Sequence, residues 1–345
     1  MSRLSKVTAL IPALVSVGFF YWVFRDVSLA SLEETLRSTH WELVLPAPML
    51  IGLGIFFKAW RWQILLKPLH GSLPLEIPFS AMSVGTLVDQ ILPGKIGELV
   101  RAHLVGQHAG ISRASVFGTV VVERVFDILS VLTLSGIAIL SLGLTNPLLH
   151  RSLWACLLLL AILISLLLLF WKSRPLRQRL TLRFLPGQLA VKINRLLEEV
   201  GRGLRTITHW HHSGKALLAT ILMWGTYVIA FMPLLYAVGI QPEPPLHTAF
   251  VLIFLTAIGV AIPTAPGGMG IYEFVAALSL GITLPSGTVD SPEMAAKVAV
   301  FGLLYHLTSL GPELLAGIYC LNREFPGMGF RRAISRLRSQ PSPET

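Results

Sequence analysis

The sequence is poor in charged residues and in cysteine. Only 13% of its 345 residues are charged and 53% are hydrophobic, whereas a soluble chain usually carries about 25% charge. Its two cysteines, Cys156 and Cys320, lie far apart in apolar runs without metal-ligand spacing, so we interpret them as small core residues. This composition excludes an ordinary soluble protein and indicates one that crosses a membrane several times.

Recognised enzyme motifs are also absent. The chain has no glycine-rich phosphate loop ending in Gly-Lys-Ser or Gly-Lys-Thr and no His-Glu-x-x-His zinc motif. Its longest hydrophilic stretch, 172–215, is too short for a soluble catalytic domain. We therefore expect no catalytic residues, no metal and no cofactor, and we interpret the protein as a non-enzyme.

The net charge of +10 arises from two basic segments, and the rest of the chain is close to neutral. Ten Lys and Arg residues lie in 172–215 against two glutamates, and the tail 323–345 is also basic. Basic residues collect in the cytoplasmic loops of membrane proteins, where anionic headgroups attract them. We therefore predict that both segments are cytoplasmic, and we expect no nucleic-acid partner.

Apolar runs long enough to cross a membrane as helices recur along the chain. They lie at about 7–24, 41–57, 114–142, 153–171, 216–239 and 297–320. Two further apolar regions, about 79–93 and 247–284, are interrupted by Pro-Gly. Lys58, Arg61 and Lys67 follow the second run, so we expect them in a cytoplasmic loop.

The distribution of Lys and Arg indicates that each interrupted region begins and ends on the same side of the membrane. Region 79–112 begins and ends on the basic, cytoplasmic side, whereas 247–284 is flanked by loops without Lys or Arg and begins and ends outside. We therefore predict an all-α polytopic inner-membrane protein with about six full spans, two opposed re-entrant helical hairpins and both termini in the cytoplasm. We expect one transmembrane domain over 1–322.

The two hairpins suggest an internal duplication. Block 41–142 is a span, a cytoplasmic hairpin and a span, and block 216–320 repeats this order in the opposite orientation, as an inverted repeat would. Coincidence is the alternative, because Pro and Gly are common in membrane helices.

The first interruption combines a Pro-Gly break with charged residues. Lys95, Glu98 and Arg101 share one face if the segment is helical from Gly94 onward. Gly94 lets backbone N–H groups approach a ligand, and a helix N-terminus attracts anions. Two cations around one carboxylate predict a site for a lipid phosphate. The alternative is an interfacial salt-bridge cluster whose cations snorkel.

Three more charged residues, Glu123, Arg124 and Asp127, lie in the next apolar run. Charges within a span are costly unless they are paired or face a cavity. We expect them to pair with Lys95 or Arg101 and to form a charged network that anchors the first hairpin. A coupling role, in which the carboxylates sense a proton or cation, is the alternative.

The second interruption, 263–270, cannot form a regular helix because of its Pro and Gly residues. We expect Gly267, Gly268, Gly270 and Glu273 to contribute to the lipid site. Glu273 either caps the next helix or contacts a ligand or ion within the membrane. Further candidates for buried polar residues are Asp89, Gln90, His306 and Glu313, of which we interpret His306 as a hydrogen-bonded core residue.

The blocks Leu92–Arg101, Glu123–Asp127 and Pro263–Glu273 occur in this order. Together they resemble the lysylphosphatidylglycerol synthase transmembrane family, also called flippase-like domain proteins. The resemblance covers nearly the whole chain before the basic tail. It implies a membrane region that, in the full-length synthases, is associated with moving modified lipid between leaflets. Aminoacyl transfer in those synthases belongs to a separate soluble domain, which we do not expect here.

The resemblance also implies which residues correspond to the motifs of the family. Lys95, Glu98 and Arg101 match the first block; Glu123, Arg124 and Asp127 match the second; Gly267, Gly268, Gly270 and Glu273 match the third.

Three functions are compatible with these observations. The first is translocation of a phosphate-bearing lipid, either a phospholipid or a polyprenyl phosphate. The second is an integral-membrane transferase acting on such a lipid, with Glu98, Glu123 or Asp127 as the base. The third is a non-catalytic partner of a membrane glycosyltransferase. A homodimer is left open.

Overall fold

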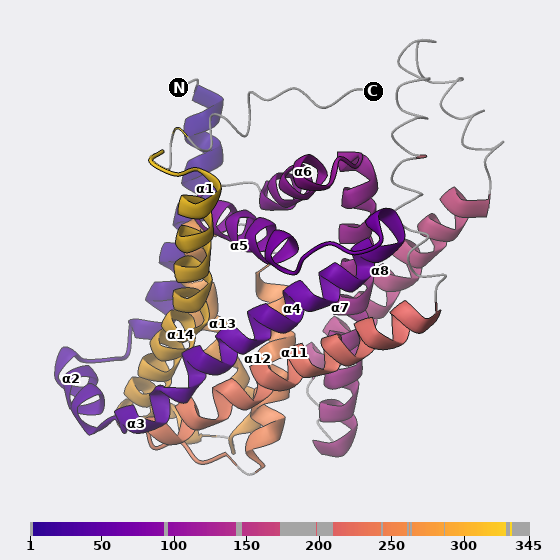
Figure 1. The fold of residues 1–345 in the computed structure, drawn as a ribbon. Coiled ribbons are helices and arrows are strands. Elements are labelled where there is room, and N and C mark those ends of the chain that lie inside the picture. The colour runs from indigo at the N-terminus through magenta and orange to yellow at the C-terminus, as the bar shows by residue number, and fades with distance from the viewer. Residues whose placement is uncertain are drawn as a thin grey trace.

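The computed structural model describes residues 3–92, 96–142, 147–172, 198, 210–242, 244–260, 262, 264–285, 287–328 and 332. The regular elements in this part of the chain are helices (Figure 1). They are α1 (Arg3–Phe24), α2 (Leu29–Ser38), α3 (Trp41–Val44), α4 (Pro46–His70), α5 (Glu76–Ile91), α6 (Gly97–Ala109), α7 (Arg113–Leu142), α8 (Pro147–Lys172), α11 (Trp210–Ala237), α12 (Pro245–Gly259), η2 (Pro266–Gly268), α13 (Ile271–Thr283), η3 (Thr288–Asp290) and α14 (Pro292–Glu324). The predicted all-α class is confirmed.

Several helices suit a membrane. Among the described residues, three segments are long and apolar enough to cross one: Trp41–His70, Gly214–Ala237 and Pro292–Glu324. The helices Leu10–Phe24 and Leu29–Ser38 are bent by 78° and add a fourth if they form one span. A polytopic helical membrane protein agrees with these lengths, because about 20 residues cross the hydrocarbon core. The number of six spans stays a prediction.

The second predicted span extends further than expected. Helix α4 continues to His70 and so includes Lys58, Arg61 and Lys67. Arg61 and Trp62 are fully buried in it. The placement of these basic residues in a loop was wrong, because a charged side chain can stay within a membrane helix when neighbouring helices supply opposite charges.

Both interrupted regions form pairs of short, packed helices. Helices α5 and α6 have 16 and 13 residues, and α12 and α13 have 15 and 13. At 1.5 Å per residue each is shorter than the roughly 30 Å hydrocarbon core. Helix α5 ends at Ile91 and packs against α6, which begins at Gly97, and α12 packs against α13 on the other side of η2. Both predicted breaks are therefore present, although Gly94 and Lys95 of the first lie outside the described residues.

The contacts between helices have an internal correspondence. Helices α4 and α11 lie along one another across the molecule (Figure 1). Helix α5 packs against α14 as α12 packs against α7, and α6 packs against α7 as α13 packs against α14. Exchanging α4–α7 with α11–α14 therefore maps one set of contacts onto the other. This correspondence supports two equivalent halves, while their opposite orientation in a membrane stays a prediction.

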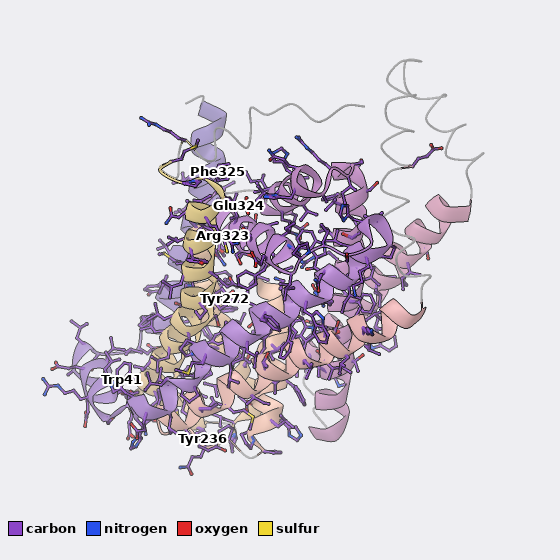
Figure 2. The ribbon with its side chains drawn as sticks, viewed as in Figure 1. Trp41, Tyr236, Tyr272, Arg323, Glu324 and Phe325 are labelled. Carbon is purple, nitrogen blue, oxygen red and sulfur yellow. The ribbon has the colours of Figure 1, made fainter. Side chains whose placement is uncertain are left out.

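Aromatic and charged residues mark the two ends of the molecule. Trp41 and Tyr236, both exposed, lie at one end, and Arg323, Glu324 and Phe325 lie at the other (Figure 2). Aromatic residues are enriched at membrane interfaces and basic residues on the cytoplasmic side. The start of α1 and the end of α14 lie at the same end (Figure 1), and the cytoplasmic location of both stays a prediction.

Opposite accessibility of the two hairpins is a testable consequence. In a Cys156→Ala/Cys320→Ala background, we expect Gln107→Cys, at the end of α6, to react with an impermeant maleimide in inside-out vesicles only. Thr288→Cys, in η3 after α13, should react in right-side-out vesicles only. Labelling of both positions from one side would contradict the opposed arrangement of the hairpins.

Candidate functional site

The first hairpin is held closed at its break. The backbone N–H of Gly97 donates to Asp89 Oδ1 at 2.6 Å, so the carboxylate of α5 satisfies the N-terminus of α6. Gly85 and Gly97 bring the two helices into backbone contact, since a Cβ on Gly85 would lie 2.7 Å from the carbonyl oxygen of Gly97. This packing aims Glu98 and Arg101, on the first two turns of α6, toward α7.

Six ionic side chains from α4, α6 and α7 form a cluster that we call the charge network. Its members are Arg61, Glu98, Arg101, Glu123, Arg124 and Asp127. Three are cations and three are carboxylates, so the network is neutral as a unit. Burial of such charges is tolerable only because they are paired.

Glu123 is the centre of the charge network. Its side chain is fully buried and accepts hydrogen bonds from Arg101 Nη1 at 2.9 Å and Arg124 Nη2 at 2.8 Å. Arg61 Nη2 approaches it to 3.5 Å, while Arg61 Nη1 lies 2.7 Å from Asp127 Oδ1. The predicted pairing of α7 with Arg101 is thus confirmed. Because α4, α6 and α7 all contribute, the network joins the first hairpin to two long helices.

Arg61 was missed by the sequence prediction. The positive-inside rule assigns a Lys and an Arg after an apolar run to a loop. The apolar sequence Ile64-Leu65-Leu66 beyond Arg61 was the signal that the helix continues, and all three residues are buried. No local feature, however, identifies Asp127 as the partner of Arg61, because 66 residues separate them.

The buried arginines retain donors without acceptors. Nε of Arg61 and Nε of Arg101 have no hydrogen-bond partner among the described residues. Their Nη2 atoms reach carboxylates only at 3.5 and 3.8 Å. The Arg101 guanidinium also lies over the ring of Trp62, 5.0 Å from its centroid. Buried N–H groups are normally satisfied, so the geometry leaves capacity for a further acceptor such as a phosphate oxygen.

Lys58 and Glu313 extend the polar region toward α5 and α14. Lys58 is half-buried and experiences the negative charges of Glu123, Asp127 and Glu313. Glu313 accepts a hydrogen bond from Gln90 Nε2 at 3.0 Å. Lys58 and Glu313 both line a cavity of about 10 Å³ between α4, α5 and α14. This volume is close to the minimum that holds one water. Polar groups therefore continue from the charge network toward the second half of the protein.

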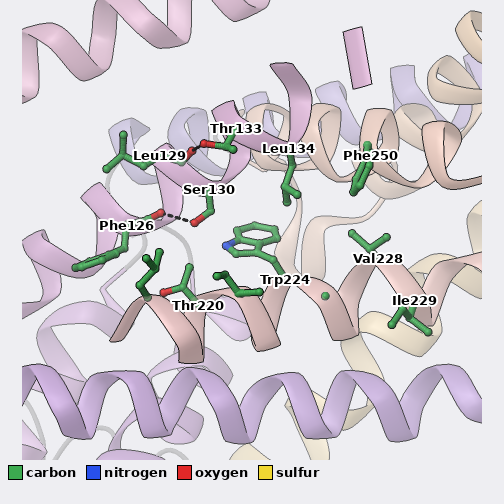
Figure 3. A pocket seen from close by; sticks show the side chains of 13 residues that line it. Phe126, Leu129, Ser130, Thr133, Leu134, Thr220, Trp224, Val228, Ile229 and Phe250 are labelled. Atoms are coloured by element: carbon green, nitrogen blue, oxygen red, sulfur yellow. Dashed lines mark hydrogen bonds between the residues drawn. The ribbon is translucent and has the colours of Figure 1, made fainter. Parts of the chain in front are cut away.

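An apolar cavity of about 480 Å³ adjoins the charge network (Figure 3). It lies between α7 and α11, with Phe250 of α12 at its edge. Thr220 both lines the cavity and accepts a hydrogen bond from Arg61 Nη1 at 3.4 Å. The indole of Trp224 projects from α11 toward Ser130 of α7 (Figure 3), and its buried Nε1 has no hydrogen-bond partner in the described part of the chain.

The second hairpin is closed by its own polar groups. Gly270 N–H donates to Glu273 Oε2 at 2.9 Å, so capping, one of the two alternative roles of Glu273, is present. His306 Nδ1 lies 2.8 Å from Glu273 Oε1, and His306 Nε2 lies 2.8 Å from the carbonyl oxygen of Gly267. Gly267, Gly268 and Gly270 all have positive φ, which glycine adopts without strain. The interpretation of His306 as a hydrogen-bonded core residue is confirmed.

The predicted lipid-site residues therefore fall into two groups. Glu98 and Arg101 join Glu123, Arg124 and Asp127, whereas Gly267 and Glu273 contact His306, Gly270 contacts Glu273, and Gly268 lies next to Gly267 in η2. The two groups belong to different hairpins, and α5 of the first contacts η2 of the second. Lys95 and Gly94 lie outside the described residues.

These features define a helical membrane protein in which two broken hairpins meet beside a buried charge network. The family described as the lysylphosphatidylglycerol synthase TM region matches residues 9–317, and the chain belongs to this family. Its sequence is 26% identical over 288 residues to a UPF0104 membrane protein of Methanothermobacter thermautotrophicus, covering 78% of this chain and 82% of that protein.

Two further relatives are matched over less of their length. A UPF0104 membrane protein of Methanocaldococcus jannaschii is 28% identical over 127 residues, which cover 36% of this chain and 37% of the relative. The glycosyltransferase AglD of Haloferax volcanii is 20% identical over 273 residues, which cover 68% of this chain and 44% of AglD. The chain thus spans less than half of each of these two proteins.

Proposed function

We propose that this protein binds a phosphate-bearing lipid and moves its head group between the leaflets of the inner membrane, without catalysing a chemical reaction. The observation that carries the proposal is the set of unsatisfied N–H donors on buried Arg61 and Arg101, next to an apolar cavity. A phospholipid or a polyprenyl phosphate has the matching pair of features, a charged acceptor and a hydrocarbon chain.

The head group would accept hydrogen bonds from the arginines of the charge network. Guanidinium groups bind phosphate oxygens with directional, charge-assisted hydrogen bonds. The network is neutral, so a bound phosphate needs nearby cations. Lys58 lines the small polar cavity beside the network, and the sequence predicts Lys95 as a further basic residue. Arg124, whose side chain is 41% exposed, provides the side from which a head group can enter.

The hydrocarbon chain would occupy the apolar cavity between α7 and α11. Its volume of about 480 Å³ lies within the usual range of ligand pockets, roughly 300–1,000 Å³. Thr220 links the cavity to Arg61, so a lipid bound there has its head at the charges and its chain between the helices. The Trp224 indole N–H, which faces the cavity, could donate to an ester or phosphate oxygen of the bound lipid.

Partnership with a membrane glycosyltransferase is the second candidate function. The similarity to AglD favours it, because that relative is named a glycosyltransferase. The transferase alternative has less support, since a catalytic base must be free to accept a proton. Glu123 and Asp127 are instead engaged by arginines.

A cavity-filling substitution tests the proposal. Gly225 lines the apolar cavity, and a Cβ built there has no neighbour within 4 Å. We expect Gly225→Phe to fill the space of the chain and to slow leaflet exchange of a fluorescent anionic phospholipid or polyprenyl phosphate in proteoliposomes by about tenfold or more, equivalent to about 1.4 kcal/mol in the barrier.

The matched control is Gly225→Ala, which adds one methyl group and should keep the wild-type rate. Equal rates for the Phe and Ala variants would contradict a chain site in this cavity. Exchange no faster than in protein-free vesicles, for every lipid in the panel, would contradict translocation itself.

A further inference from the structure

The second hairpin contains a buried pair that must share one proton. The carbonyl oxygen of Gly267 can only accept a hydrogen bond, so His306 Nε2, 2.8 Å away, must carry a hydrogen. Nδ1 then either donates to a Glu273 carboxylate or accepts from a protonated Glu273, across 2.8 Å. In both forms the pair holds one proton in addition to the Nε2 hydrogen. Removing it would leave two acceptors facing each other in a buried place.

The surroundings of Glu273 favour the carboxylate form. Its Oε2 accepts from the Gly270 N–H at 2.9 Å, and it lies on the first turn of α13, where a negative charge is favoured. We therefore assign the shared proton to Nδ1, which makes His306 an imidazolium. The ring of Tyr272 stacks on it with centroids 4.7 Å apart and an interplanar angle of 3°, so the imidazole orientation is defined.

The same pair holds the second hairpin loop in place. His306 on α14 ties Gly267 of η2, and Glu273 on α13 ties Gly270, on either side of the loop. Ser16 of α1 adds a third contact, since its Oγ accepts from the Ala265 N–H at 2.8 Å. The side chains of Glu273 and His306 are both buried. Loss of the shared proton therefore acts directly on the segment that contacts α5 of the first hairpin.

We propose that Glu273 and His306 form a proton-binding site whose shared proton holds the second hairpin loop closed. Deprotonation sends the Nδ1 proton to water, leaves the pair with one negative charge and breaks the His306–Glu273 hydrogen bond that positions the imidazole on Gly267. Ionisable groups on the helices packed around the pair include Lys58, Asp89, Tyr227, Tyr272, Tyr305 and Glu313. A link between this proton and lipid movement rests on the function proposed above.

Glu273→Gln is a matched control for the shared proton. Its amide oxygen can accept from the Gly270 N–H and its amide N–H can donate to an unprotonated His306 Nδ1, so the three hydrogen bonds persist without a shared proton. Glu273→Gln should therefore keep the fold and the closed loop at every pH. Glu273→Ala, which removes the contacts to Gly270 and His306, should lower the melting temperature throughout.

The test follows the His306 nitrogens by ¹⁵N NMR in lipid nanodiscs, between about pH 5 and about pH 8, the range in which imidazolium groups usually lose their proton. Loss of the signal in His306→Gln assigns it among the ten histidines. We expect both nitrogens to be protonated at the lower pH and Nδ1 to lose its proton on raising the pH. In Glu273→Gln, Nδ1 should be unprotonated throughout.

Thermal unfolding in detergent supplies the second measurement. Because the folded wild type binds a proton that its glutamine variant lacks, the melting temperature of the wild type relative to Glu273→Gln should fall as pH rises. An unprotonated Nδ1 over the whole range would overturn the assignment of the proton to His306, and parallel melting profiles would overturn the proton site itself. Neither measurement depends on lipid exchange, so they decide this inference even if the proteoliposome assay contradicts translocation.

Discussion

Glu123→Gln is expected to destabilise the protein by about 3–5 kcal/mol, the usual cost of breaking a buried ion pair. In the wild type, Arg61, Arg101 and Arg124 share Glu123 as their central carboxylate. The substitution leaves these three cations around a neutral amide. The net charge of the six-residue network changes from zero to +1. Circular dichroism during thermal and denaturant unfolding in detergent would measure the loss.

A compensating substitution separates charge balance from the loss of one side chain. Arg101 has its short ion pair with Glu123, and Glu98 is more distant at 3.8 Å. The double variant Arg101→Gln/Glu123→Gln restores neutrality and should recover more than half of the lost stability. Glu98→Gln removes a carboxylate that is 35% exposed and should cost about 1 kcal/mol or less. Equal destabilisation by all three variants would contradict the central position of Glu123.

Gly97→Ala is expected to open the first hairpin and to abolish most lipid exchange. A Cβ at Gly97 would overlap the carbonyl oxygen of Gly85 and would lie 2.7 Å from the Asp89 carboxylate that caps α6. Backbone atoms cannot move aside as a flexible side chain can, and overpacking costs about 1–3 kcal/mol or more. The shift displaces α6 and therefore Arg101 from Glu123. Melting temperature and proteoliposome exchange would both report it.

Gly136→Ala is the matched control for this change. Gly136 also lies within a helix, α7, but a Cβ there has no neighbour within 4 Å. Alanine should be neutral or should stabilise the protein by about 0.5–1 kcal/mol, because glycine is the poorer helix former. Similar effects of the two substitutions would show that close approach of α5 and α6 is not required.

Much of the helical architecture could be predicted from local sequence. Apolar runs place the long helices, as for α14, predicted at 297–320 and observed over Pro292–Glu324. Pro and Gly residues mark the second break, where α12 ends at Gly259 and α13 begins at Ile271. Both properties act within a few residues, since hydrocarbon selects continuous apolar helices and Pro-Gly interrupts their hydrogen bonds.

Local reasoning failed where a basic residue belongs to a helix interior. Arg61 resembles a loop residue because it follows Lys58 and precedes Lys67. Its burial depends on Glu123 and Asp127 of α7, which the sequence alone does not bring into contact with α4. The pairing of Arg101 with Glu123 could be predicted more readily, because unpaired charges in adjacent apolar segments have few alternative partners.

The sequence by itself determined that this is a helical membrane protein of its family, where its helices begin and break, and which charged residues need partners within the membrane. Only the tertiary structure decided that Arg61 completes the charge network, that an apolar cavity adjoins it, and that His306 ties Glu273 to Gly267. Helix formation follows from short-range hydropathy and backbone chemistry. Partners 33 or 66 residues apart are chosen by packing, which no local pattern contains.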